Sequence, residues 1–154
     1  MIKIIQVGKT KSEEIISLCA YFEKLVSGFV AVETITLNEV KPGKTFSIER
    51  CKEEEGEKIL KAIFDEYFVV ALTEEGQAFD SMQFAEKLGG FKDRGQKVCF
   101  VIGGAFGLSD GVKERADLLL SMSKMTFTHQ MVRMILLEQM YRGFCILAGK
   151  EYHH

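Results

Sequence analysis

The sequence predicts an α/β fold in which a mostly parallel sheet carries helices on both faces. Short β-branched segments alternate along the chain with longer segments of helical periodicity. Two of the expected strands, residues 67–73 (YFVVALT) and Val98–Ile102 (VCFVI), are apolar almost throughout, which is typical of strands buried on both faces. With 154 residues, of which 47% are hydrophobic, the chain is expected to form one domain over residues 1–154.

Apolar spacing, capping residues and glycine or proline breaks set the expected boundaries. The expected elements are, in order, a strand over Ile2–Val7, a helix over residues 12–26, a strand over 29–37, a loop over 38–45, a helix over 47–64, a strand over 67–73, a helix over 81–88, a turn over 89–95, a strand over Val98–Ile102, a helix over 109–116, a strand over 118–120, a helix over His129–Leu147 and a tail over 148–154.

Particular residues justify the elements of the N-terminal half. Ile2–Val7 is β-branched, and Ser12 can cap the first helix ahead of an acidic pair. The only proline, Pro42, marks the surface loop. The next helix is polar, and its run Glu53, Glu54 and Glu55 is expected on the solvated side.

The C-terminal half continues the alternation. Gly76 is expected in a loop after the first apolar strand, and the glycines of residues 89–95 are expected to form a turn. Ser109 can cap a short helix, and the final helix is the longest element of the chain.

Charge is distributed unevenly along the chain, although the net charge is only −2. Residues 1–77 carry 10 Lys/Arg against 14 Asp/Glu, whereas residues 78–154 carry 10 against 8 together with all three histidines. An anionic partner is therefore expected to meet the C-terminal half.

The cysteines and the opening segment indicate a cytoplasmic protein. Cys19, Cys51, Cys99 and Cys145 are far apart and form no CxxC pair, so reduced thiols are expected rather than a metal site or a redox pair. The first residues turn polar too soon for a signal peptide, and no apolar run is long enough for a membrane span. Neither a metal nor a membrane is therefore expected as a partner.

A glycine-rich segment, VIGGAFGLSD, follows the second apolar strand. Gly103, Gly104 and Gly107 stand where ligands bind in open α/β sheets, at the carboxyl end of a strand. A tight turn that needs positive φ explains the same glycines equally well. The spacing is neither a GxGxxG dinucleotide fingerprint nor a GK[ST] phosphate loop.

The segment SMSKMTFTH precedes the last helix and is rich in hydroxyl groups. Thr126 or Thr128 can cap that helix, and this explanation alone would suffice. The alternative is a loop that offers backbone amides and carbonyls to a small ligand.

The last helix and the tail offer further candidates. The helix is apolar nearly all round, which suits burial on several sides, including a subunit interface. Arg133 and Arg142 interrupt this surface; Arg142 either pairs with Glu138 one turn earlier or clamps a phosphate. In the tail, Tyr152 could stack on a base and His153 could move a proton near neutral pH.

Taken together, these segments resemble the RlmH family of SPOUT methyltransferases, which methylate N3 of a pseudouridine in 23S ribosomal RNA. The resemblance covers essentially the whole chain, and it rests on the set and order of the segments IKIIQVGKTK, VVALTEEGQAFDS, FVIGGAFGLSDGV, LSMSKMTFTHQMVRMILLEQMYRGF and YHH. It implies a C-terminal deep trefoil knot, a homodimer, and a large-subunit ribosomal RNA substrate within assembled ribosomes.

The resemblance also assigns site residues. It implies that S-adenosylmethionine is held by three backbone segments: Leu72; Gly103 and Gly104; and Ser123, Lys124, Met125, Thr126, Phe127 and Thr128. The imide proton of the target nitrogen must leave, so a general base is expected. His153 is the first candidate base and His129 the second, with Arg142 at a phosphate or developing charge and Tyr152 stacked on the target base.

Two other classes of function fit the same sequence. One is a non-catalytic ribosome-binding or RNA-binding module of the same fold, against which the intact glycine segment counts. The other is a flavodoxin-like enzyme with an unknotted sheet, which would hold a phosphorylated cofactor at a helix N-terminus.

Overall fold

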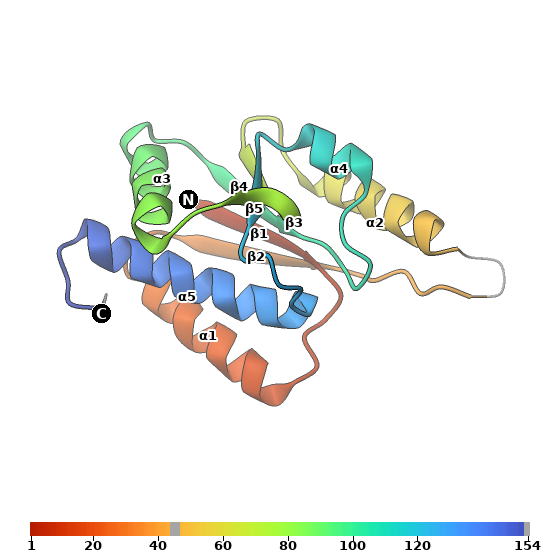
Figure 1. The fold of residues 1–154 in the computed structure, drawn as a ribbon, viewed down its shortest axis with the longest axis horizontal. Helices are drawn as coiled ribbons and strands as arrows, with labels where there is room; N and C mark the ends of the chain where they lie inside the picture. Colours follow the sequence, from red (N-terminus) through yellow and green to blue (C-terminus); the bar gives the residue numbers. More distant parts are fainter. Residues whose placement is uncertain (44–46, 153–154) are drawn as a thin grey trace.

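The computed structural model describes residues 1–43 and 47–152 as a five-stranded, entirely parallel sheet with helices on both faces (Figure 1). The strands are β1 (Ile2–Val7), β2 (Val32–Leu37), β3 (Phe68–Ala78), β4 (Val98–Ile102) and β5 (Leu118–Ser121). Their order across the sheet is β2-β1-β4-β3-β5, and every neighbouring pair is parallel. The α/β class predicted from the sequence is therefore confirmed.

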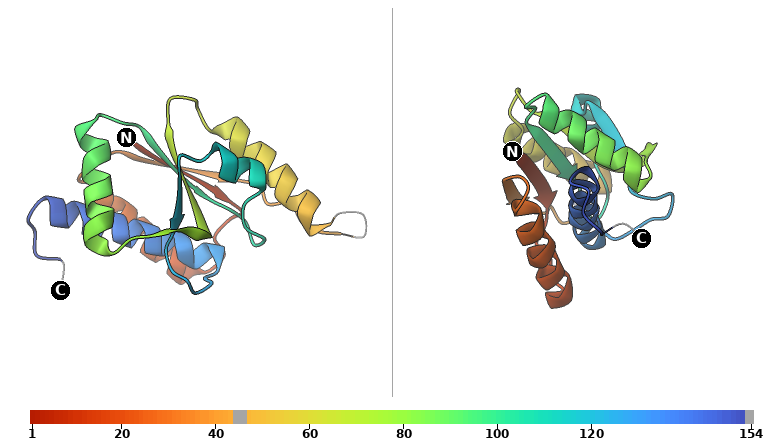
Figure 2. Two further views of the ribbon diagram at one scale, coloured as in Figure 1. Left: turned by 45° about the horizontal axis from the view of Figure 1, so that its top comes forward. Right: turned by 90° about the vertical axis from the view of Figure 1, so that its left-hand side faces the viewer.

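Two layers of helices cover the sheet (Figure 2). The helices are α1 (Glu13–Ser27), α2 (Ile48–Ala62), α3 (Ser81–Asp93), α4 (Asp110–Arg115) and α5 (His129–Leu147). One core cluster joins α1, α3 and α5 to the sheet face that carries Phe100, and the other joins α2 and α4 to the face that carries Val101. Residues 100 and 101 point to opposite faces because side chains alternate along a strand.

Strand β3 is longer than expected and is interrupted. Leu72 and Gln77 both pair with Leu120 of β5, so residues 73–76 form an irregular excursion between two paired stretches. Gly76 is part of this strand rather than of a loop beyond it. A Cβ at Gly76 would lie 2.6 Å from backbone atoms of β5, so the return of the chain to its partner strand requires glycine here.

Three other expectations were wrong in detail. The predicted turn over residues 89–95 is mostly helix, because α3 continues to Asp93. The second strand begins at Val32 rather than at residue 29. Glu55 is buried rather than solvated, with a relative exposure of 3%.

The cysteines and the helix lengths complete the description of the fold. All four cysteines are free thiols, and three of them are buried. Within the described residues, no helix is both long and apolar enough to cross a membrane.

Candidate functional site

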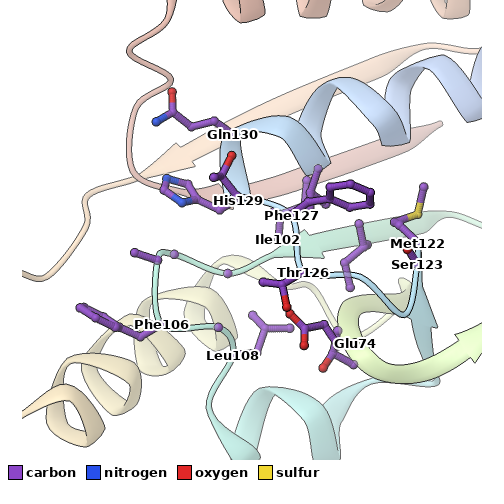
Figure 3. Close-up of a pocket in the computed structure, with 18 of the residues that line it drawn as sticks. Glu74, Ile102, Phe106, Leu108, Met122, Ser123, Thr126, Phe127, His129 and Gln130 are labelled. Carbon is purple, nitrogen blue, oxygen red and sulfur yellow. The ribbon is translucent and has the colours of Figure 1, made fainter.

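A cavity of about 930 Å³ lies at the carboxyl ends of β4 and β5 and beside the point where the first paired stretch of β3 ends (Figure 3). Leu72, Ile102 and Leu120 form its floor from three adjacent strands. In an open parallel sheet this edge is where ligands bind, and the volume falls in the range of roughly 300–1,000 Å³ usual for small-molecule sites. The cavity is therefore large enough for a nucleoside-sized ligand.

The glycine segment forms one wall of this cavity as a closed turn. Gly107 N donates to Gly104 O at 3.1 Å, and Gly107 has a φ of +82°. A Cβ at Gly103 would lie 2.8 Å from the carbonyl of Gly107, so any side chain there would force the turn open. The two interpretations of these glycines are thus compatible, since the segment is a tight turn and also lines the cavity.

The segment before α5 forms the opposite wall. The residues of this segment that line the cavity are Met122, Ser123, Met125, Thr126, Phe127 and Thr128. Lys124 is exposed and is not part of the wall. Ser123 shapes the turn, because its Oγ accepts a hydrogen bond from Met125 N at 2.9 Å. Thr128 caps α5 by accepting from Met131 N at 3.3 Å, as expected.

The irregular part of β3 adds residues to the lining that the sequence analysis did not single out. Thr73, Glu74 and Glu75 line the cavity, and Figure 3 shows Glu74 among the residues that surround it. Both glutamates are exposed, and Lys113 Nζ lies 3.1 Å from Glu75 Oε2. The signal for them was the acidic pair that directly follows the apolar run of β3.

His129, the first residue of α5, reaches the cavity beside Gln130 (Figure 3). Burial, and to a smaller extent the nearby Arg133 guanidinium, lowers the pKa of His129 below its ordinary value. Its imidazole is therefore neutral near pH 7 and able to accept a proton.

Arg133 and Gln130 fasten the loop after β1 to α5. The buried guanidinium of Arg133 donates to Val7 O at 2.5 Å and to Thr10 Oγ1 at 2.7 Å. Gln130 Oε1 accepts from Lys11 N at 2.7 Å. The cavity wall near His129 is thus held by contacts between the beginning and the end of the chain.

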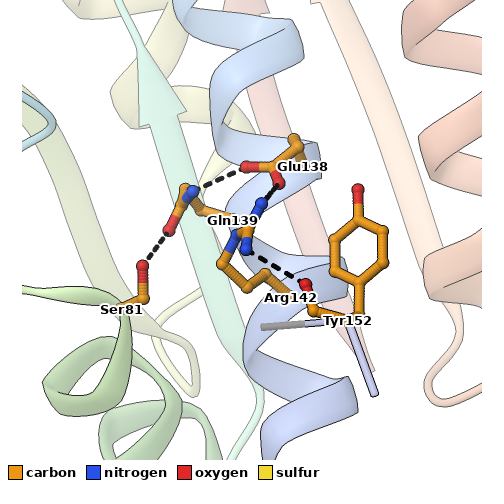
Figure 4. A network of polar contacts seen from close by, with 5 residues as sticks. All are labelled: Ser81, Glu138, Gln139, Arg142 and Tyr152. Atoms are coloured by element: carbon orange, nitrogen blue, oxygen red, sulfur yellow. Dashed lines mark hydrogen bonds and ion pairs between the residues drawn. The ribbon is translucent and has the colours of Figure 1, made fainter. Parts of the chain in front are cut away.

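Arg142 and Tyr152 lie together, away from the cavity (Figure 4). Arg142 pairs with Glu138 at 2.7 Å, donates to Tyr152 O at 3.1 Å and stacks over the Tyr152 ring at 4.9 Å. Neither residue lines the cavity, and at 1.5 Å per residue Arg142 stands roughly 20 Å along α5 from His129. His153 lies outside the described residues.

Glu55 of α2 lies behind the glycine wall. Its Oε1 accepts from Val40 N at 2.8 Å, and its Oε2 has no hydrogen-bond partner among the described residues. A Cβ at Gly104 would lie 2.7 Å from that Oε2. Burial raises the pKa of Glu55 above its ordinary value.

The described residues contain no group of three or more His, Cys, Asp or Glu side chains arranged to hold a metal ion.

Comparisons with known proteins agree on one family. A family model described as "Predicted SPOUT methyltransferase" matches residues 1–153. Proteins named ribosomal RNA large subunit methyltransferase H are 42% identical in Caldicellulosiruptor bescii and 41% identical in Streptococcus gordonii, over 99% of this chain and 99% and 98% of theirs. The solved SpoU methyltransferase AviRb from Streptomyces viridochromogenes matches with a TM-score of 0.52 at 14% identity, over 97% of this chain and 61% of that one.

Proposed function

Because the chain belongs to the SPOUT methyltransferase family, among the ribosomal RNA large subunit methyltransferase H proteins, we propose that it methylates N3 of a pseudouridine in large-subunit ribosomal RNA and takes the methyl group from S-adenosylmethionine. The observation that carries this proposal is the cavity in which three adjacent strands, the glycine turn and the segment before α5 converge.

The cavity suits a cofactor that joins a purine nucleoside to a charged amino acid. Apolar side chains such as Leu72, Ile102 and Leu108 offer a surface for a flat base. The hydroxyl groups of Ser123 and Thr126 offer polar partners, as do backbone groups of the glycine turn and of the segment before α5. We assign cofactor binding to Leu72, Gly103, Gly104, Ser123, Met125, Thr126, Phe127 and Thr128. Lys124 joins this set only through its backbone, because its side chain lies outside the lining.

The lining fits a phosphorylated cofactor less well. Among the described residues, Lys52 and Lys113 are the only lysine or arginine residues that line the cavity, and Lys113 is paired with Glu75. A flavin or nucleotide phosphate would thus meet few free cationic groups. This favours the methyl donor over the flavodoxin-like alternative.

The chemistry required of the protein is positioning and proton removal. When bound, S-adenosylmethionine supplies a methyl group made electrophilic by its sulfonium. The chain's part is to hold the acceptor nitrogen in line with that methyl, a form of catalysis that supplies much of the rate in such transfers. The acceptor also loses its imide proton, so a neutral histidine near the cavity is the group to expect.

His129 and His153 are the two candidate bases. His129 is supported by its place in the lining and its lowered pKa. We expect replacement of the true base by alanine to lower kcat about 100-fold or more, with the Kd for S-adenosylmethionine changed less than threefold. Single-turnover methylation by His129→Ala and His153→Ala distinguishes them. If both variants keep more than a third of the wild-type rate, neither histidine is the base.

A homodimer explains why candidate residues occur at both ends of α5. Arg142 and Tyr152 cannot reach the cavity of their own chain, since α5 separates them from it. We propose that a second copy brings its Arg142 and tail to this cavity. We also propose the C-terminal trefoil knot of the family for this chain.

Assembled large ribosomal particles in the cytoplasm are the proposed substrate. The modest charge of one chain favours weak binding to naked RNA, because phosphate neutralisation dominates such affinity. Two C-terminal halves in a dimer enlarge the basic surface.

Transfer of labelled methyl from S-adenosylmethionine to ribosomes from cells that lack this enzyme tests the proposal. We expect label in the large-subunit RNA of whole ribosomes and little in free RNA, with the mapped product an N3-methylated pseudouridine. Cofactor binding without methyl transfer to either whole ribosomes or free RNA would refute large-subunit ribosomal RNA as the substrate. Absence of cofactor binding would instead favour the non-catalytic RNA-binding module.

A further inference from the structure

Glu55 is a buried carboxyl group in contact with the backbone of the glycine turn. Its exposure is 3%, and its Oε2 lies where a Cβ of Gly104 would approach to 2.7 Å. Its other oxygen accepts a hydrogen bond from Val40 N at 2.8 Å. The carboxyl group therefore fills the space between the turn and the segment that follows β2.

The same face of α2 supports the turn at a second point. A Cβ at Gly56 would lie 2.0 Å from Ser109 Oγ, so α2 approaches the end of the glycine segment as closely as glycine allows. Lys52, one turn before Glu55 and Gly56, reaches the cavity itself. The α2 helix thus forms the back of the wall whose front lines the cavity.

Local ion pairing does not account for a carboxyl group at this position. The charge of Lys58 acts on Glu55, but its Nζ donates to Asn38 O at 3.2 Å. Burying a carboxyl group without an ion pair is unfavourable, and here burial raises its pKa. An amide acceptor such as glutamine would satisfy Val40 N without a buried titratable group, so the charge-capable carboxyl group beside Gly104 calls for a second explanation.

We propose that Glu55 is a positioning residue for the methyl donor. Its carboxyl group, which accepts a hydrogen bond from Val40 N, fixes the position of the Gly103–Gly107 turn relative to the bound cofactor. This inference rests on the proposed function, because it concerns the same cavity. Glu55 acts through the backbone of Gly104, and its side chain does not line the cavity.

A double-mutant cycle between Glu55 and Gly104 tests this role. The alanine methyl group of Gly104→Ala points at the Glu55 carboxyl group, so that it displaces the turn only while Glu55 is present. We expect Glu55→Ala and Gly104→Ala each to raise the Kd for S-adenosylmethionine about tenfold by isothermal titration calorimetry. The double variant is expected to stay near tenfold rather than to reach the additive hundredfold.

Kinetics and control variants separate positioning from a purely structural role. Glu55→Ala should raise KM for the cofactor about tenfold, while kcat at saturating cofactor stays within threefold of wild type. Glu55→Gln keeps an acceptor for Val40 N and should restore Kd to within threefold. Glu53→Ala, on the exposed side of α2, should leave both constants unchanged. If circular dichroism shows that Glu55→Ala is unfolded, Glu55→Asp replaces it in the cycle, because it withdraws the carboxyl group by one methylene.

Two results would overturn the inference. One is a Kd within twofold of wild type for a folded Glu55→Ala or Glu55→Asp variant, even with a lower Tm. The other is additive effects of the Glu55 and Gly104 substitutions. Either result alongside tight binding by the wild type rejects only the role of Glu55, whereas absence of binding by the wild type rejects the proposed function and this inference with it.

Discussion

The N-terminal end of α5 lies at a cavity, whereas its C-terminal end carries a compact polar network on the surface. At the first end, His129 and Gln130 join walls built from three strands and two loops. At the second, Arg142 contacts Glu138 and Tyr152, and neither Arg142 nor Tyr152 lines that cavity. The first arrangement suits a small ligand and the second suits a macromolecular one. The proposed reaction would use both ends of this one helix.

Among the changes that compare the two ends of α5, the largest expected effect comes from Arg142→Ala, which removes the network at the second end. We expect the rate of methyl transfer to fall about 100-fold, as for loss of one preorganised polar group at a reacting centre. The Kd for S-adenosylmethionine should change less than threefold, because the cavity is roughly 20 Å away along the helix. Single-turnover assays and calorimetry measure the two quantities.

Arg115→Ala serves as the control for Arg142→Ala, because Arg115 pairs with Asp117 and does not line the cavity. If Arg142→Ala lost cofactor binding and rate to the same extent, it would contradict the proposal that only the first end of α5 binds the cofactor.

A smaller and opposite effect is expected from Gly103→Ala at the first end. The added methyl group would lie 2.8 Å from the carbonyl of Gly107, so the turn must open. We expect the Kd for S-adenosylmethionine to rise about tenfold, with kcat at saturating cofactor nearly unchanged.

Gly111→Ala in α4 is the matched control, since its Cβ meets nothing nearer than Leu60 at 3.8 Å. Equal Kd values for the two alanine variants would show that the glycine turn does not hold the cofactor.

The smallest expected effect concerns stability and pH. The pKa of Glu55 is raised in the folded chain, mainly by burial, so the folded state holds this proton more tightly than the unfolded state. The resulting stabilisation is present below the pKa of about 4.5 that Glu55 has in the unfolded chain. It is lost as pH rises through the pKa that Glu55 has in the folded chain.

Glu55→Gln removes this titration. Relative to wild type, its Tm should therefore improve by a few degrees between pH 4.5 and pH 7.5. Thermal unfolding of both proteins across this range measures the difference. A constant difference in Tm would mean that Glu55 titrates alike in both states.

Strands with a continuous apolar run and helices with a clear cap could be predicted from the sequence. Val98–Ile102 and His129–Leu147 have the predicted bounds, because burial and capping there are local properties. The continuation of β3 beyond Thr73 was missed, since it depends on pairing with β5 more than 40 residues later. The α3 helix runs through Gly89, where a Cβ would lie 3.0 Å from the Leu147 side chain of α5. No local sequence pattern reveals this close approach between the two helices.

The candidate site was predictable in part. The glycine turn and the segment before α5 were marked from their composition, and the structure brings them to one cavity with Leu72. Their proposed roles came from family resemblance. Burial of Glu55 was not predictable, because an acidic run on a polar helix is usually solvated.

The contacts of Arg133 and Gln130 have a consequence for how the chain reaches its native state. They join partners 119 to 126 residues apart, so the loop after β1 remains without its anchors until α5 is in place. During synthesis the first strand emerges long before the helix that fixes the loop beyond it. Contacts of such long range slow folding. The cavity should therefore be among the last parts to form, only after α5 has left the ribosome.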